Sequence, residues 1–483
     1  MSCQLPADCL NDIFEYLRDD EEEDTLRSCL LVNRLWCEVS VPILWTNIQS
    51  YNTLITCLPI ESKEILFKNG IIISTLTSRP PLFNYVTFIK ILKIYEIVET
   101  IKTIYKHTVS QSTDTNKEIV MIQEIFKMFM NQISLKRLDF YSSYSRKSYV
   151  NNISFFTYPG AIDCLKNLSM FNCSSDVHYE FFHQLSQTCH HLQSLKITIR
   201  KVISNGLTKL ISVQQNLKYL KISNELHDNY EVMKVIFPSL TKLPNTLIKI
   251  NLFFDVDYHI PLSFLAKFTN LQEIVLSLGW FDDEYFKILH HVTFPRLQIL
   301  KFLDGYPNHE HLTKFFENNG ENLKELHISR GNGNNRNSLN LAIAKFCLNL
   351  KSLYTTILYN EIETFKEILS SCQQLESIEI LCGKDYLNIG ELLNVVARYS
   401  SKEFYELRIR PIDKYELFPE ALESGFTSWA NRIPQKPLSF IIIETCYMGK
   451  LVIKKESMEA IEKFKELGVI KKFETVWRLK GIM

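Results

Sequence analysis

Residues 323–328 read Leu-Lys-Glu-Leu-His-Ile: an apolar side chain, two polar ones, then apolar, polar and apolar again. In an extended strand alternate side chains point to the same side, so the segment predicts a short strand with one buried face. The same spacing returns at Ile89–Ile94, Leu135–Phe140, Leu165–Met170, Leu192–Ile197, Leu217–Ile222, Leu247–Leu252, Leu271–Leu276, Leu297–Phe302, Leu350–Thr355, Leu375–Ile380, Phe404–Ile409 and Leu438–Ile443.

From Leu135 to Phe404 the pattern recurs every 24 to 30 residues. A period in this range around such a core resembles the leucine-rich repeat. Between the strands, 179–189, 283–290 and 361–370 are expected to be helices. A single repeat cannot bury its apolar face, so neighbours stack. We therefore expect an α/β fold, a leucine-rich-repeat solenoid shaped as a horseshoe, with a parallel sheet on the concave side and helices on the convex side.

The first 45 residues carry a different pattern, typical of short helices. Leu10, Ile13, Phe14 and Leu17 follow the i, i+3, i+4, i+7 spacing of one apolar helical face, and residues 26–33 repeat it. A unit this small is near the limit at which a domain is stable alone, so it is expected to need a partner.

These residues resemble the F-box, the motif that docks substrate receptors onto the Skp-type adaptor of cullin–RING ubiquitin ligases. The matching elements, in order, are Leu5-Pro6, the Ile-Phe-x-x-Leu helix, Val-Asn-Arg-x-Trp at 32–36 and the closing Leu44-Trp45. An acidic insertion at 20–24 departs from the pattern. The resemblance implies that the adaptor-binding residues are Leu5, Pro6, Leu10, Ile13, Leu17, Val32 and Trp36. The competing interpretation is an amphipathic N-terminus packed on the rest of the chain.

The patterns divide the chain into an F-box at 1–48, a linker at 49–88, repeats at 89–453 and a terminal cap at 454–483. The cap is expected to begin with a charged amphipathic helix over 454–472, followed by the apolar residues 473–477. A polar-faced cap is what a solenoid needs at its end.

Composition narrows the classes of partner. Lysine plus arginine equals aspartate plus glutamate at 54 each, so net charge gives no argument for nucleic acid or an anionic membrane. We expect no membrane span and no secretory leader. The 12 cysteines are scattered without CxxC pairs, which favours reduced thiols and a cytoplasmic or nuclear location. Cys189, Cys347 and Cys372, three residues before a repeat leucine, are expected to be buried spacers.

The residues between the repeat leucines are expected to face the concave surface. Lys196, Lys221 and Lys249 come from consecutive strands, roughly 5 Å apart, and flank Tyr219 and Phe253. This basic and aromatic patch suits an acidic or phosphorylated peptide of a target protein. It also fits an ordinary solvated sheet face, because lysine is abundant throughout the chain.

Catalytic patterns are missing from the sequence. There is no glycine-rich phosphate loop and no GxSxG, HExxH or kinase pattern. His309 and His311 come nearest to a ligand pair, and surface histidines are the more ordinary interpretation. We expect no enzymatic activity, no cofactor and no metal.

The resemblance therefore implies the substrate-recognition subunit of a Skp–cullin–F-box ubiquitin ligase. The F-box would bind the Skp-type adaptor and, through it, a cullin–RING ligase, while the repeats hold a target for proteasomal degradation. Two alternatives stay open. One is a non-catalytic interaction scaffold outside ubiquitylation. The other is a ligand-sensing repeat protein with a concave pocket closed by the loop at 331–338.

Overall fold

A computed structural model of the chain describes residues 5–19, 23–71, 81–108, 115–141, 155–200, 204–224, 230–254, 260–279, 286–329, 336–383, 385–412, 415–433, 436–445 and 451–478. Internal contacts divide it into two units, Met1–Pro244 and Asn245–Met483. Each is described by itself.

The first unit begins with short helices, as the apolar spacing predicts. They are α1 (Ala7–Asp19), α2 (Glu23–Cys29), α3 (Arg34–Leu44), α4 (Tyr51–Thr56) and α5 (Ile60–Lys68). The side chain of Asn33 caps α3 by accepting a hydrogen bond from the Trp36 amide at 2.9 Å. Of the acidic insertion at 20–24, residues 20–22 lie outside the described residues and Glu23 and Asp24 begin α2.

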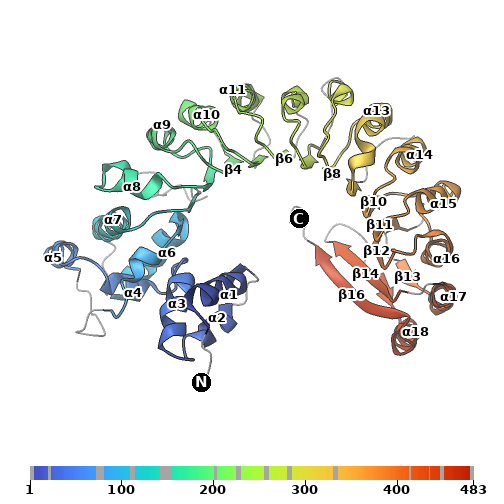
Figure 1. The fold of residues 1–483 in the computed structure, drawn as a ribbon, viewed down its shortest axis with the longest axis horizontal. Coiled ribbons are helices and arrows are strands. Elements are labelled where there is room, and N and C mark those ends of the chain that lie inside the picture. Colours follow the sequence, from blue (N-terminus) through green and yellow to red (C-terminus); the bar gives the residue numbers. More distant parts are fainter. Residues whose placement is uncertain are drawn as a thin grey trace. The chain divides into compact units, whose positions relative to one another are not determined.

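A parallel sheet follows in the first unit, with β1 to β5 adjacent in chain order. Its strands are β1 (Ile91–Lys93), β2 (Arg137–Phe140), β3 (Met170–Ser174), β4 (Ser194–Ile199) and β5 (Tyr219–Asn224). The accompanying helices, which Figure 1 shows on one side of the strands, are α6 (Ile94–Thr108), α7 (Thr115–Gln132), α8 (Ala161–Leu165), α9 (Tyr179–Thr188), α10 (Asn205–Ser212) and α11 (Tyr230–Leu240).

The second unit also carries a parallel sheet, ordered β6-β7-β8-β9-β10-β11-β12-β14-β16. Its strands are β6 (Lys249–Phe254), β7 (Glu273–Ser277), β8 (Ile299–Asp304), β9 (Glu325–Ile328), β10 (Ser352–Thr355), β11 (Ser377–Cys382), β12 (Glu406–Pro411), β14 (Leu438–Thr445) and β16 (Ile470–Arg478). A separate pair of short strands is formed by β13 (Tyr415–Leu417) and β15 (Leu451–Ile453).

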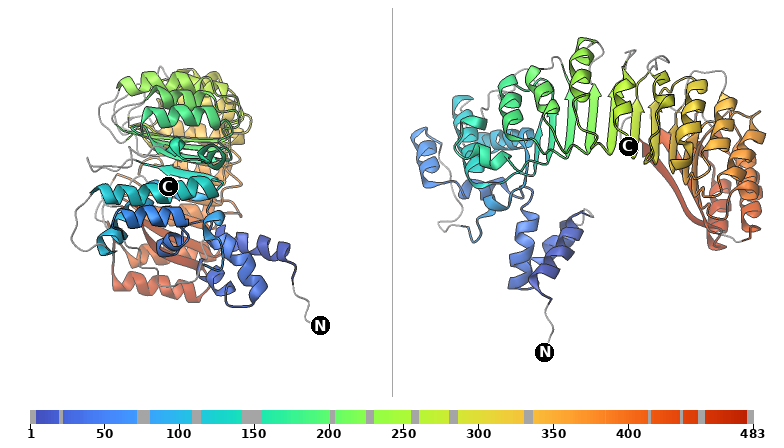
Figure 2. Two further views of the ribbon diagram at one scale, coloured as in Figure 1. Left: turned by 90° about the vertical axis from the view of Figure 1, so that its left-hand side faces the viewer. Right: turned by 45° about the horizontal axis from the view of Figure 1, so that its top comes forward.

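Helices pack side by side along the second sheet (Figures 1 and 2). They are α13 (His309–Asn319), α14 (Arg336–Phe346), α15 (Ile362–Ser371), α16 (Ile389–Tyr399), α17 (Pro419–Ala430) and α18 (Lys455–Glu466). Between β6 and β8 the described return segments include the 3-10 turns Leu262–Lys267 and Leu289–His291. Of the helix predicted over 283–290, residues 283–285 lie outside the described residues, 286–287 are α-helical, and a 3-10 turn follows from Leu289. The helices predicted at 179–189 and 361–370 are confirmed as α9 and α15.

Alternation along the strands separates two faces of each sheet. In β4 and β5 every second side chain is buried against the helices, and the others are half-buried on the opposite side. We call that helix-free side the open face; it corresponds to the surface that the sequence predicts to be concave. Gly279 and Gly305, which follow strands β7 and β8, have φ of 60° and 70°, a backbone conformation that favours glycine.

The predicted frame is wrong in two strands. In β3, Phe171 pairs with Leu138 and with Leu195, so Phe171 and Cys173 fill the core and Met170 is exposed. The leucine at 165 belongs to α8 instead, and the step from β2 to β3 is 33 residues. In β14, Phe440 and Ile442 pair with Leu407 and Ile409, one residue away from the predicted frame.

The terminal cap contains a strand that the sequence analysis does not assign. Helix α18 confirms the amphipathic helix after residue 454, but the chain then returns as β16, which pairs with β14 in parallel. Phe473 stacks on Phe440 with ring centroids 6.0 Å apart. The segment 473–477 is therefore part of the sheet.

The buried cysteines behave as predicted. Cys189, Cys347 and Cys372 are almost completely buried. The Cys372 thiol donates to the Cys347 carbonyl at 3.4 Å, and burial raises the pKa of Cys189 and Cys372 to about 12. They are protonated spacers between repeats.

Candidate functional site

The N-terminal helices form a small core of their own. Leu10 and Phe14 of α1 and Leu26 of α2 are buried, and Phe14 meets Trp36 of α3 edge-on with centroids 5.2 Å apart. This packing buries one side of α1. Other apolar side chains of α1 are exposed to solvent.

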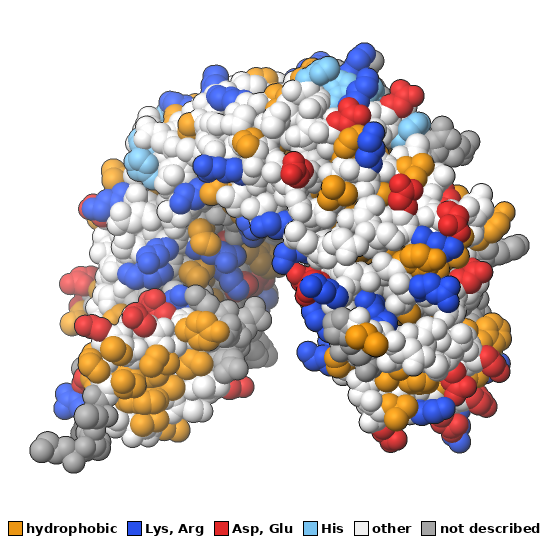
Figure 3. All heavy atoms as spheres, turned by 45° about the vertical axis from the view of Figure 1, so that its right-hand side comes forward, with side chains coloured by type: hydrophobic (Ala, Val, Ile, Leu, Met, Phe, Trp, Pro, Cys, Tyr) orange, Lys and Arg blue, Asp and Glu red, His pale blue; other side chains and the backbone are white. Residues whose placement is uncertain are grey.

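Several large apolar side chains of these helices are exposed. Ile13 is 46% exposed and Val32 56%, and Leu5, Tyr16 and Leu31 are exposed as well. Figure 3 shows hydrophobic side chains gathered over this part of the molecule, at the lower left. An apolar group of this kind, rimmed by charged side chains, is typical of a protein-binding surface.

The residues expected to bind an adaptor differ in how exposed their side chains are. Leu5, Pro6, Ile13 and Val32 are exposed, and Leu17 and Trp36 are half-buried. Leu10 is only 1% exposed. It holds the helices together, so we assign it to the core and not to the contact surface. Tyr16 and Leu31 are additional exposed residues that the motif comparison omitted.

The last turn of α3 joins these helices to the repeats of the first unit. Trp45 packs on Tyr85 with ring centroids 4.3 Å apart. The Thr46 carbonyl accepts hydrogen bonds from the amides of Lys90 and Ile91 at 3.0 and 3.3 Å, next to β1. The attachment therefore uses the C-terminal end of α3 and leaves the exposed side chains of α1 uncovered.

On the open face of the first unit, Lys196 and Lys221 lie directly opposite each other on β4 and β5. The Lys196 ammonium lies 5.6 Å from the centre of the Tyr219 ring. Burial, and then the charge of Lys196, lower the pKa of Lys221. Beside them, the Thr198 and Ser223 hydroxyls are 3.4 Å apart. The structure thus brings together Lys196, Tyr219 and Lys221 as predicted.

Lys249 and Phe253 belong to the second unit. Both lie on β6, where the Lys249 ammonium forms an ion pair with Glu273 of β7 at 2.9 Å. Lys249 is therefore partly neutralised by its own sheet. We therefore restrict the predicted patch to its residues in the first unit, Lys196, Tyr219 and Lys221.

The second unit holds a cavity that the sequence analysis did not select. It encloses about 200 Å³ on the open face and is lined by Lys301, Glu325, His327, Tyr354, Glu379 and Arg408. The rings of His327 and Tyr354 are 4.0 Å apart, and the Arg410 guanidinium lies 4.8 Å from the centre of the Tyr354 ring. Lys301, His327, Tyr354, Glu379 and Arg408 occupy the middle position of successive strands, which is the signal in the sequence that identifies them.

Charges around this cavity are balanced by neighbours. Lys301 pairs with Glu325 at 2.7 Å, and Arg408 pairs with Glu406 at 2.7 Å. A third pair, Arg410–Glu379, is more deeply buried. Beside it, Tyr354 packs with Leu381 and Tyr386 in a small apolar cluster. Of the loop 331–338, expected to close a ligand pocket, residues 331–335 lie outside the described residues and residues 336–338 begin helix α14.

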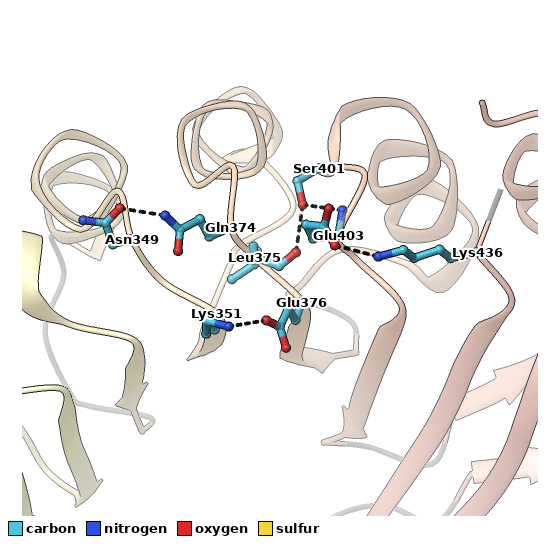
Figure 4. Close-up of polar contacts among 8 residues, drawn as sticks. All are labelled: Asn349, Lys351, Gln374, Leu375, Glu376, Ser401, Glu403 and Lys436. Atoms are coloured by element: carbon cyan, nitrogen blue, oxygen red, sulfur yellow. Dashed lines mark hydrogen bonds and ion pairs between the residues drawn. The ribbon is translucent and has the colours of Figure 1, made fainter. Parts of the chain in front are cut away.

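Contacts between successive repeats fix the spacing of these strands (Figure 4). The Gln374 amide donates to the Asn349 side chain at 3.1 Å. One level closer to the strands, Lys351 pairs with Glu376 at 2.7 Å. Residues on neighbouring strands of the open face are therefore held at a constant register.

The histidine pair closest to a ligand arrangement in the sequence lies on a helix. Instead of lying in a loop, His309 and His311 begin α13, and the His311 ring packs 5.2 Å from that of His290. Burial and the neighbouring histidines lower the pKa of His290. Throughout the described part of the chain, no cluster of three His, Cys, Asp or Glu side chains fits a metal ion.

Comparison with known proteins adds little to this description. No protein-family model and no curated protein matches the chain. Among solved structures, it is similar to the leucine-rich repeat-containing protein LegL7 from Legionella pneumophila, with 12% identity and a TM-score of 0.33. The match covers 65% of this chain and 96% of that chain. The repeat fold is assigned from the parallel strands of the chain itself. None of the described helices is long and apolar enough to cross a membrane.

Proposed function

We propose that this chain is the substrate-recognition subunit of a Skp–cullin–F-box ubiquitin ligase. Helices α1 to α3 bind the Skp-type adaptor, and the open face of the repeats holds a target protein. The chain carries out no catalysis. Other subunits transfer ubiquitin, and tethering raises the effective concentration of target lysines around them.

One observation carries the adaptor half of the proposal: an apolar surface stays exposed although the helices already have a core. Ile13, Leu31 and Val32 are large and exposed, and Leu5 of the Leu5-Pro6 opening is exposed as well. Leaving such side chains in water forgoes about 1.5–3 kcal/mol each relative to full burial. A partner that covers them would recover this free energy.

The adaptor half is tested with Ile13→Asp and Val32→Asp in the full chain, using the Skp-type adaptor of the same organism. A carboxylate forced into an apolar interface must lose its hydration, so we expect binding to weaken by at least about 2 kcal/mol, more than tenfold. Isothermal titration calorimetry measures the affinity. The matched control is Ile433→Asp, because Ile433 is 99% exposed and belongs to the second unit.

Two outcomes would count against this assignment. Unchanged adaptor binding by both variants, with the folding transition intact by circular dichroism, would remove the α1 surface from consideration. Adaptor binding without recruitment of a cullin would favour the alternative of an interaction scaffold outside ubiquitylation.

The target half rests on Lys196 and Lys221, two cations in register on the open face. We propose that they contact an acidic or phosphorylated segment of the target. Changing both to glutamate reverses the local charge, so target capture in proximity labelling with proteasome inhibitor should fall several-fold. The matched control is Lys93→Glu, on β1 of the same sheet, where the lysine already pairs with Glu96. Equal losses in both variants would contradict the assignment.

A further inference from the structure

Strand β16 ends the sheet of the second unit. It pairs with β14 along one edge, and within the described residues no strand pairs with its other edge. Figure 1 shows it as the outermost strand of this sheet, and Figure 2 shows its length. At nine residues it is longer than any other strand of either unit. A long edge is a template for pairing with another chain.

The first strand of the other unit is a useful contrast. β1 has three residues, and the amides just before it and at its start are already bonded to the Thr46 carbonyl. Short length and a covering segment are the usual protections of a sheet edge. Strand β16 has neither protection among the described residues.

From Lys472 onward, after a register shift at Lys471, the side chains of β16 alternate between the two faces. Lys472 and Glu474 lie on the open face, opposite Ser439 and Ile441 of β14, and pair with each other at 2.6 Å. On the helix side, Phe473 is half-buried against Phe440, and Trp477 remains 55% exposed. The edge thus presents aromatic surface on one side and one charge of each sign on the other.

The charge order decides which occupant fits this edge. Lysines on an edge strand normally discourage pairing, and Lys471 and Lys472 are such residues. Glu474 changes the outcome, because an antiparallel strand of the same sequence centred on Phe473 sets Lys472 opposite Glu474 twice. The same register sets Phe473 opposite its own copy and Lys471 opposite Thr475 twice. Over residues 471–475 it sets no like charges opposite each other.

We propose that β16 pairs antiparallel with β16 of a second copy of this chain, with the two-fold axis through Phe473. The contact is isologous, so each edge is closed by the other and growth stops at the dimer. It joins two sheets into one and covers the half-buried aromatic side chains at their ends. The proposal does not depend on the proposed function, because it uses no residue of the N-terminal helices or of the lysine pair.

Sedimentation velocity of the full chain tests the dimer. A monomer has a mass of 56.6 kDa, and we expect twice this mass at micromolar concentration. E474K puts two lysines opposite each other at both charge positions, so the dimer should dissociate at concentrations at least about tenfold higher than for the wild type. The double exchange K472E/E474K restores opposite charges and should restore the dimer.

The control is E459K, the same charge change on the exposed face of α18, where Glu459 pairs with Lys455 at 3.5 Å. It should leave the dimer intact. At about 100 µM, well above the micromolar Kd expected for the dimer, the wild-type chain should be dimeric. A wild-type chain that stays monomeric at this concentration would overturn the proposal. So would an E474K dimer as stable as the wild type, or a double variant that fails to recover while its circular dichroism is unchanged.

Discussion

The open faces of the two units arrange their charged residues differently. In the first unit, Lys196 and Lys221 stand opposite each other as like charges. In the second unit, Lys301 pairs with Glu325 and Lys249 pairs with Glu273. Lys301 occupies the strand position of the lysine pair, and the other three residues lie two positions earlier. One sheet sets two cations opposite each other, and the other sets cations beside carboxylates.

This difference indicates where binding is expected. Like charges directly opposite each other on a sheet are destabilising, so such an arrangement contributes nothing to folding. An arrangement that costs stability is a candidate functional site. Elsewhere in the first unit a cation is paired: Arg137 donates two hydrogen bonds of 2.9 and 3.0 Å to the Asp139 carboxylate. The comparison therefore favours the lysine pair as the binding site and the second face as scaffold.

The largest effect is expected from breaking the buried ion pair between Arg410 and Glu379 on the open face of the second unit. In Glu379→Ala, the Arg410 guanidinium loses its partner while 13% exposed, and the free energy of unfolding should fall by about 3 kcal/mol. The control is Glu325→Ala, in a pair whose carboxylate is 36% exposed, with an expected cost below about 1 kcal/mol. Urea unfolding followed by circular dichroism measures both. Equal losses would show that the second face is not an internally stabilised scaffold.

A smaller effect of opposite sign is expected at Thr356. Its hydroxyl is buried just after β10 and has no hydrogen-bond partner among the residues that the structure describes. Thr356→Val removes the unsatisfied group at nearly constant volume, so the protein should gain about 1 kcal/mol of stability. The same unfolding measurement checks it. A loss of stability would mean that the hydroxyl is satisfied in solution and that this site is open to water.

The sequence predicts much of this comparison, because the leucine spacing determines which residues share a face. It places Lys196 and Lys221 side by side correctly. The frame fails at β3, where Leu165 and Leu168 both fit the pattern and only pairing with β2 shows that Phe171 and Cys173 fill the core. Spacing alone cannot distinguish two apolar residues three positions apart when either completes the motif.

The ion pairs on the open face of the second unit could not be predicted from the sequence, for a different reason. The middle positions of its strands could be read from the spacing, but which carboxylate meets which cation depends on rotamers and register. Glu379 pairs with Arg410 of the next strand, two residues further along, and not with Arg408, which is directly opposite. Strand β16 was missed because its mixed charged and aromatic residues lack the leucine pattern.

The smallest effect concerns the lysine pair itself. Burial and the charge of Lys196 lower the pKa of Lys221 below its ordinary value of 10.5. In Lys196→Gln the second cause disappears, so the pKa of Lys221 should rise, as followed by NMR of 13C-methylated lysines.

The lowered pKa also makes stability depend on pH. Between the lowered pKa and 10.5 the unfolded chain binds more protons than the folded chain, so the free energy of unfolding of the wild type increases with pH in this window. The variant should show a weaker increase. At neutral pH the variant should be more stable by about 0.5 kcal/mol. An unchanged pKa would mean that the two ammonium groups do not interact, and the contrast between the two faces would lose its electrostatic basis.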